Sequence, residues 1–210
     1  MPEPKKDQPR LKGYVYIDKM QPRYSALLSK TVKGDMPING MAQLYIELYP
    51  AVEVYRALDI ALKASNARPA FLIAERSFGS LEIHSFSRTD IEEAGAAIQR
   101  AYGAVEHQMK PKIVSAQIIT NVDPYEAQLI TNFANTGLMI ANASLFVLEV
   151  VPACFAALAC NEAEKGADVA IVGLQWSGQT GRLYVSGSES QVRAARDAAV
   201  DKINAMPGEE

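Results

Sequence analysis

The sequence predicts an α+β fold made of two tandem copies of one small domain, each a small, mostly antiparallel sheet with packed helices. The main observation is a repeat, because identical residues recur without gaps at a single offset of 102 positions, beginning at Pro22 and Pro124. Further matched pairs are Leu27 and Leu129, Ile38 and Ile140, Glu47 and Glu149, Pro50 and Pro152, Lys63 and Lys165, and Gly79 and Gly181. The second observation is that segments of strand and helix character follow in the same order in both copies.

In the first copy, prolines predict where two helices begin, since proline suits the first helical turn. Asp90 is the predicted cap of the last helix, and the last two strands are expected to join around Gly79. The expected strands are Gly13–Ile17, Leu44–Leu48, Ala70–Ala74 and Leu81–Phe86, and the expected helices are Pro22–Thr31, Pro50–Ser65 and Asp90–Tyr102.

The second copy repeats this order. Its expected elements are Ile113–Ile119, Pro124–Asn132, Leu145–Val150, Pro152–Lys165, Val169–Leu174, Leu183–Val185 and Gln191–Ile203. The predicted domains are therefore residues 11–105 and 112–205, joined by a linker at 106–111. Residues 1–10 are expected to form a flexible N-terminal tail and residues 206–210 a C-terminal tail.

Composition excludes several classes of protein. The 210 residues include 24 acidic and 21 basic side chains, and 49% are hydrophobic, which favours a packed globular chain over a disordered one. The small net charge of −3 gives no support for a nucleic-acid partner, and no apolar run is long enough to span a membrane. The N-terminus lacks the apolar stretch of a secretory signal. With only two cysteines, the expected location is the cytoplasm.

No enzymatic site is apparent, and no cofactor or metal is expected. His84 and His107 lie in a strand and in the linker without ligands at metal-binding spacing. Cys154 and Cys160 are six residues apart on a helix and are predicted to be buried, as free cysteines usually are. The stretch 173–178 has the glycine spacing of a phosphate-binding loop but lacks its lysine.

One charged pair distinguishes the first copy from the second. Glu75 and Arg76 form a charged pair where a strand enters a tight turn, whereas the second copy has Ser177 and Gly178 there. An exposed ion pair of little energetic value is the simpler interpretation of the first pair.

Matched charges occur at both ends of the long helix of each copy. Lys63 and Lys165 lie near its C-terminus, where a cation is favoured by the helix dipole, although a matched position also suggests a contact that both copies make. Glu47 and Glu149 precede the helix and are interpreted as structural.

The chain resembles bacterial microcompartment shell domains over about residues 11–205. The motifs that carry the resemblance are Tyr14-Val15-Tyr16-Ile17-Asp18, Ala61-Leu62-Lys63-Ala64, Glu75-Arg76-x-x-Gly79, Val114-Ser115-x-Gln117 and Asn161-Glu162-Ala163-Glu164-Lys165. Each copy begins with the strand and helix that end the standard domain, so the chain is most similar to the circularly permuted tandem type with a gated pore.

The resemblance implies a structural protein whose three chains form a pseudohexameric tile. In the subgroup that the chain resembles most, two such tiles stack face to face. Glu75 and Arg76 are then the pore gate, and Ser77, Gly79, Ser177 and Gly178 belong to the pore loops. Lys63 and Lys165 match the lysine at the family's tile edge. The implied partners are further copies of this chain, hexameric and pentameric shell proteins, and small metabolites crossing the pore.

Two other classes of function stay open at this point. Duplicated small α+β domains also occur in cytosolic trimers that sense small molecules by binding them between subunits. An enzyme is the third possibility, and the absence of catalytic motifs argues against it. Assembly into flat tiles or cages separates the shell protein from both.

Overall fold

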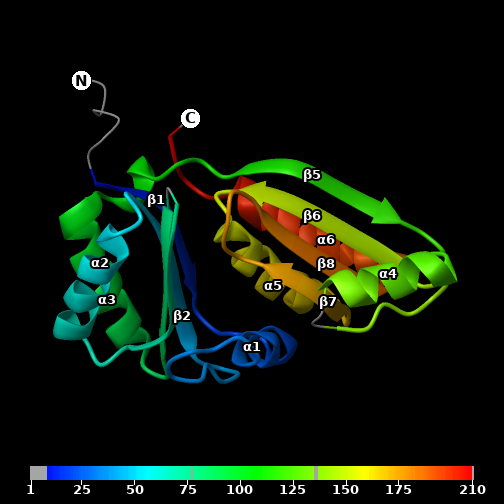
Figure 1. The fold of residues 1–210 in the computed structure, drawn as a ribbon, viewed down its shortest axis with the longest axis horizontal. Helices are drawn as coiled ribbons and strands as arrows, with labels where there is room; N and C mark the ends of the chain where they lie inside the picture. Colours follow the sequence, from blue (N-terminus) through cyan, green and yellow to red (C-terminus); the bar gives the residue numbers. More distant parts are fainter. Residues whose placement is uncertain (1–8, 77, 135–136, 210) are drawn as a thin grey trace.

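A computed structural model describes residues 9–76, 78–134 and 137–209, and it shows two α+β units that follow one another along the chain (Figure 1). The first unit consists of β1 (Arg10–Ile17), α1 (Pro22–Ser29), β2 (Ala42–Tyr49), α2 (Glu53–Ala64), β3 (Arg68–Glu75), β4 (Phe78–Ser85) and α3 (Arg88–Tyr102). Its four strands form an antiparallel sheet in the order β1-β2-β4-β3.

The second unit repeats the first after a short 3-10 turn, η1 (Val105–His107). It consists of β5 (Lys112–Ile119), α4 (Pro124–Ala134), β6 (Ser144–Val151), α5 (Phe155–Gly166), β7 (Ala170–Gln175), β8 (Gly181–Gly187) and α6 (Glu189–Asn204). The sheet order β5-β6-β8-β7 is the same, and β1 and β5, β2 and β6, and α2 and α5 differ by the predicted 102 residues at both ends. The tandem α+β fold is therefore confirmed.

Four helix starts differ from the prediction, and α6 begins at Glu189, two residues before the predicted Gln191. Pro50 and Pro152 follow cis peptide bonds and lie in turns before α2 and α5, so they do not open these helices. The cap of α3 is Ser87, whose side chain accepts a hydrogen bond from the backbone N–H of Asp90. Sequence spacing alone does not separate a capping residue from an acid three positions later, because both are favoured in the first turn.

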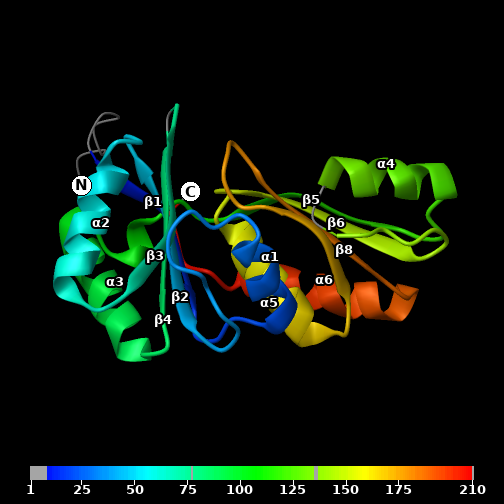
Figure 2. The same cartoon turned by 60° about the horizontal axis from the view of Figure 1, so that its bottom comes forward.

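The layers show how the units meet (Figures 1 and 2). Helices α2 and α3 cover one face of the first sheet, with Leu44 and Leu48 of β2 facing them in one apolar cluster. Tyr45 of the same strand, which points to the opposite face, belongs to the cluster of the second unit's helix α5. The first sheet is consequently buried on both faces, and α5 lies between the two sheets.

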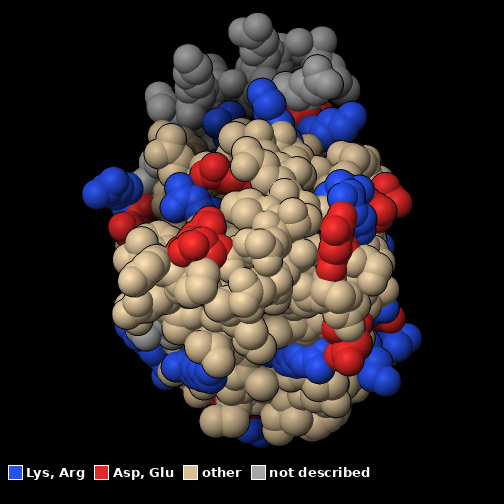
Figure 3. Space-filling model, turned by 90° about the vertical axis from the view of Figure 1, so that its right-hand side faces the viewer, with Lys and Arg blue, Asp and Glu red and all other residues tan. Residues whose placement is uncertain are grey.

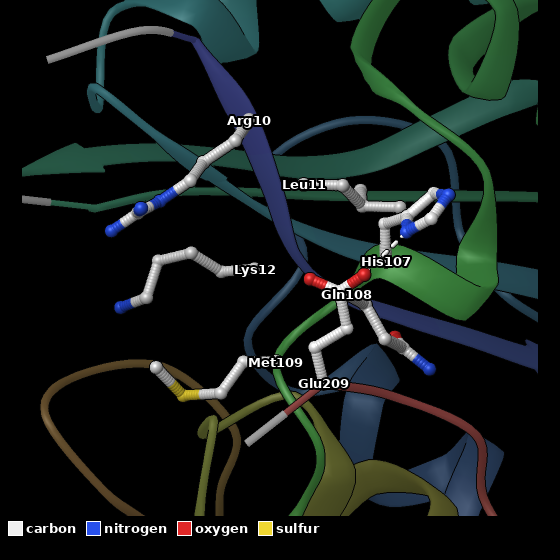
Figure 4. A pocket seen from close by; sticks show the side chains of 7 residues that line it. All are labelled: Arg10, Leu11, Lys12, His107, Gln108, Met109 and Glu209. Carbon is white, nitrogen blue, oxygen red and sulfur yellow. Dashed lines mark hydrogen bonds and ion pairs between the residues drawn. The ribbon is translucent and has the colours of Figure 1, made fainter. Parts of the chain in front are cut away.

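The predicted linker and the predicted C-terminal tail contact each other (Figure 4). Gln108 is fully buried; its Oε1 accepts from the N–H of Tyr14 at 2.6 Å and its Nε2 donates to the carbonyl of Pro207 at 2.9 Å. His107 Nδ1 lies 2.5 Å from a carboxylate oxygen of Glu209, which raises the pKa of His107. These contacts join β1, the linker and the chain end beside a cavity of about 280 Å³.

The described helices include none that is both long enough and apolar enough to cross a lipid bilayer.

Candidate functional site

The turn between β3 and β4 carries the charged pair that distinguishes the first copy. Glu75 ends β3, opposite Phe78 in β4, and Arg76 follows with a φ of +51°, a conformation that favours glycine. Both side chains are exposed. Holding arginine there costs of order 1 kcal/mol or more, which the surrounding structure has to supply.

The surroundings of Glu75 and Arg76 decide whether the pair is a simple surface ion pair. Among the described residues, neither the Glu75 carboxylate nor the Arg76 guanidinium makes an ion pair or side-chain hydrogen bond, so the simple surface ion pair is not formed. Phe78, which pairs with Glu75, has the Nζ of Lys12 at 5.5 Å from the centre of its ring.

The other predicted loop residues have separate places. Ser77 lies outside the described residues. Gly79 is the second residue of β4 and not part of the turn; a Cβ there would overlap the carbonyl oxygen of Ala51 and lie 2.8 Å from Cβ of Val54. Close packing of α2 on the strand, rather than turn flexibility, therefore requires this glycine.

The second copy has a longer connection between its corresponding strands. Ser177 and Gly178 lie between β7 and β8, and Gly178 has a φ of +122°. The Ser177 carbonyl accepts a hydrogen bond from Gln175 Nε2 at 3.3 Å. Figure 2 shows the β3–β4 hairpin and the orange β7–β8 connection pointing to the same, upper side of the molecule.

The matched lysines have different surroundings at the C-terminal ends of α2 and α5. The Lys63 side chain is 75% exposed, and its Nζ forms an ion pair with Asp59 on the same helix, at 2.7 Å. The Lys165 side chain is 35% exposed; it contacts Glu162 at 2.8 Å and Asp18 of the first unit at 3.4 Å. Lys63 therefore faces solvent where Lys165 borders the junction between the units.

A buried carboxylate stands at the centre of that junction. Glu47 of β2 is 1% exposed, and its Oε1 accepts a hydrogen bond of 2.8 Å from the backbone N–H of Cys154 at the start of α5. Burial raises the pKa of Glu47 to about 7, although Lys12 and the N–H groups of Cys154 and Ala153 oppose the rise. The prediction of a structural acid at a helix N-terminus holds, but the helix belongs to the other copy. Cys154 and Cys160 are free and buried, as predicted.

The same helix also holds the start of α1. The two carboxylate oxygens of Glu164 accept from the N–H groups of Arg23 and Tyr24 at 2.9 Å each, and Oδ1 of Asn161 accepts from the N–H of Gln21 at 2.9 Å. Sequence reasoning missed these three hydrogen bonds. Glu164 has no acidic counterpart in the first copy, where Leu62 stands, so the repeat gave no signal for it.

The surfaces that correspond to this junction, on β5 and α4 of the second unit and on α2 of the first, are exposed in the single chain. Strand β1 is mostly buried, whereas β5 is exposed or half-buried along its length. Figure 3 shows a broad surface without charged side chains at the end of the molecule formed by the second unit. The large apolar side chains exposed on and after α4 are Tyr125, Leu129, Phe133, Leu138 and Ile140, and those on and before α2 are Val52, Tyr55 and Leu62. Exposed apolar surface of this extent marks an interaction site.

Known proteins share this fold and sequence. Residues 11–108 match the family model of the CsoS1D N-terminal domain. The carboxysome shell protein CcmP of Synechococcus elongatus is 40% identical over 201 residues, covering 95% of this chain and 94% of CcmP. The carboxysome shell protein CsoS1D of Prochlorococcus marinus is 36% identical, covering 94% of this chain and 78% of CsoS1D.

Two solved structures superpose over nearly the whole chain. The fused permuted hexameric shell protein MSM0275 of the RMM microcompartment gives a TM-score of 0.92 at 37% identity, over 96% of this chain and all of MSM0275. The double ringed trimeric shell protein MSM0271 of the same microcompartment also gives 0.92, at 34% identity, over 97% of this chain and all of MSM0271.

These relatives are structural shell proteins, which supports neither the enzyme nor the small-molecule sensor considered from the sequence. The predicted resemblance is confirmed by sequence identity and by the fold together. The chain belongs to the family of tandem-domain, circularly permuted bacterial microcompartment shell proteins and is a structural component of such a shell.

Proposed function

We propose that three chains close into a ring of six domains, a pseudohexameric shell tile whose axial pore is gated by Glu75 and Arg76 for the passage of metabolites. The observation that carries the proposal concerns the contact between the units. Each chain contains one such contact and exposes the two surfaces that correspond to its two sides in the other units. A contact that repeats head to tail and closes gives a ring. The trimeric and hexameric relatives support the number of chains.

The gate follows from symmetry and charge. A threefold axis beside the β3–β4 turns brings together three Glu75 carboxylates and three Arg76 guanidinium groups. Among the described residues of its own chain, each of these groups has no ion-pair partner. Pairing between neighbouring chains narrows the pore, since charge-assisted hydrogen bonds to arginine are short and directional. The strained φ of Arg76 supports a turn with a second arrangement, because leaving the left-handed conformation releases backbone strain.

The gate is tested on the assembled protein by electron cryomicroscopy of wild type, Glu75→Ala and Arg76→Ala. We expect both variants to remain trimeric and to show a wider aperture than the closed wild type, because each loses one member of every cross-chain pair. Ser177→Ala in the corresponding turn of the second copy is the matched control and should keep the wild-type aperture. A closed aperture of unchanged width in both charged variants contradicts the gate.

Tile-to-tile contacts are proposed for Lys63 and Lys165, with other copies and with hexameric and pentameric shell proteins as partners. The exposed position of Lys63 at the end of α2 supports this role. Stacking of two trimers is a second level of assembly, supported by the double ringed trimeric relative. The particle mass in solution, three chains or six, decides between a single and a double layer.

A further inference from the structure

The two junctions of the ring can be compared residue by residue, because the units differ by a constant 102 positions. Inside the chain, Gly13 and Glu47 face the start of α5 at Cys154. A Cβ added to Gly13 would overlap the Cys154 sulfur, so the two backbones approach closely here. The corresponding residues are Ser115, Glu149 and Val52, and Ser115 pairs with Glu149 just as Gly13 pairs with Glu47.

These counterparts are unoccupied in the single chain. Val52, at the N-cap position of α2, is 66% exposed, and no side chain in the described part of the chain caps the helix. Glu149 turns instead to its own unit, where its Oε1 accepts from Thr180 Oγ1 at 2.7 Å and from Arg182 at 3.1 Å. A carboxylate has lone pairs beyond these bonds and can also accept an N–H.

We infer that, in the ring, Glu149 of one chain caps the N-terminus of α2 of the next chain at the backbone N–H of Val52, and that α2 seats against β5 and α4. This inference rests on the proposed ring and names its contact. It assigns the uncharged surface of Figure 3 to one occupant, helix α2 of a second copy.

The chemistry at the far end of α2 fits the same partner. Within the chain, Glu164 of α5 caps α1. In the second copy, α4 caps itself, since Asp123 Oδ1 accepts from the N–H of Tyr125 at 2.8 Å. The residue that corresponds to Glu164 is Leu62, and it is thereby free to make an apolar contact with Tyr125 and Leu129, which are 80% and 69% exposed. Helix α4 therefore needs no capping carboxylate from α2, and the apolar Leu62 suits the apolar surface of α4.

Cysteine cross-linking tests the register of the contact. Val52→Cys with Ser115→Cys should give disulfides between chains under mild oxidant and a covalent trimer on a denaturing gel. The native cysteines are buried and contribute little. Val52→Cys with Tyr125→Cys is the matched control: both positions are exposed, but the inferred register places them at opposite ends of α2, so it should not form the covalent trimer. A trimeric protein in which only the control pair cross-links overturns the inferred register.

The capping contact is tested by Glu149→Gln and Glu149→Ala, with trimer dissociation measured by mass photometry. We expect Glu149→Ala to weaken the trimer about tenfold or more and Glu149→Gln less, because the amide oxygen still accepts a hydrogen bond. Glu47→Gln, the counterpart inside the chain, should leave trimer dissociation unchanged. Equal dissociation of wild type and Glu149→Ala overturns the cap while the ring stands; a wild-type protein that is not trimeric overturns the ring itself.

Discussion

The buried carboxylate of Glu47 makes the stability of the folded chain depend on pH. Its pKa rises from 4.5 to about 7 on burial. Because the folded state binds this proton more tightly than the unfolded state, the stabilisation is fully present below the unfolded pKa and is lost as pH rises through the folded pKa. At about 1.4 kcal/mol per pKa unit, the loss between acid and alkaline conditions is about 3 kcal/mol.

Substituting Glu47→Gln removes this titration and keeps an oxygen that can accept the Cys154 N–H. We therefore expect Glu47→Gln to match wild type near pH 5 and to be more stable by about 2 to 3 kcal/mol near pH 8. Thermal and urea unfolding at the two pH values, at one protein concentration, measure the difference. Glu93→Gln is the control, since Glu93 is exposed on α3. A Glu47→Gln variant with the wild-type pH profile refutes the reasoning.

Two further substitutions test single positions. Gly79→Ala should destabilise the chain by about 2 kcal/mol or more, because its Cβ would overlap the Ala51 carbonyl oxygen at the start of α2; urea unfolding against Gly40→Ala, where a Cβ meets open space but φ is +90°, separates packing from backbone strain. Lys63→Ala should leave the trimer intact and impair growth of two-dimensional sheets seen by electron microscopy, whereas sheets like those of wild type would contradict an edge role.

The fold was predictable because the repeat and the hydrophobic spacing act locally. In the described residues, the α-helices and strands lie where both copies predict them, because the same hydrophobic pattern occurs twice and each copy supports the interpretation of the other. The errors fall at element ends, where local chemistry allows several solutions: Pro50 enters a turn, Ser87 caps α3 in place of Asp90, and Gly79 lies in β4.

The candidate site was predictable only in part. The charged turn was visible because Glu75 and Arg76 have no charged counterparts in the second copy. The junction was not, because Glu47 and Glu149 are identical in sequence and differ only in what the fold brings to them. A repeat reports which positions share a role in the domain, while long-range packing decides whether a neighbour is present in the same chain.

Arg182 is the residue that makes the two junctions differ in charge. Hydrogen bonds from Thr180 and Arg182 hold the pKa of Glu149 below its ordinary value, so Glu149 enters the inferred contact already ionised and paired. At the matched place beside Glu47 stands Ser80, and the neighbouring Lys12 is matched by Val114.

Arg182→Ser therefore removes the cation beside Glu149 and places there the serine found beside Glu47, while the hydrogen bond from Thr180 remains. Burial in the ring then favours a protonated carboxyl, and trimer formation by the variant should weaken about tenfold between about pH 6 and pH 8, whereas wild type changes little. The fraction of trimer by mass photometry at both pH values checks this, with Arg193→Ser, whose side chain pairs with Glu189 on the same helix, as control. If Arg182→Ser assembles equally well at both pH values, ring closure does not bury Glu149, and the equivalence of the two junctions fails.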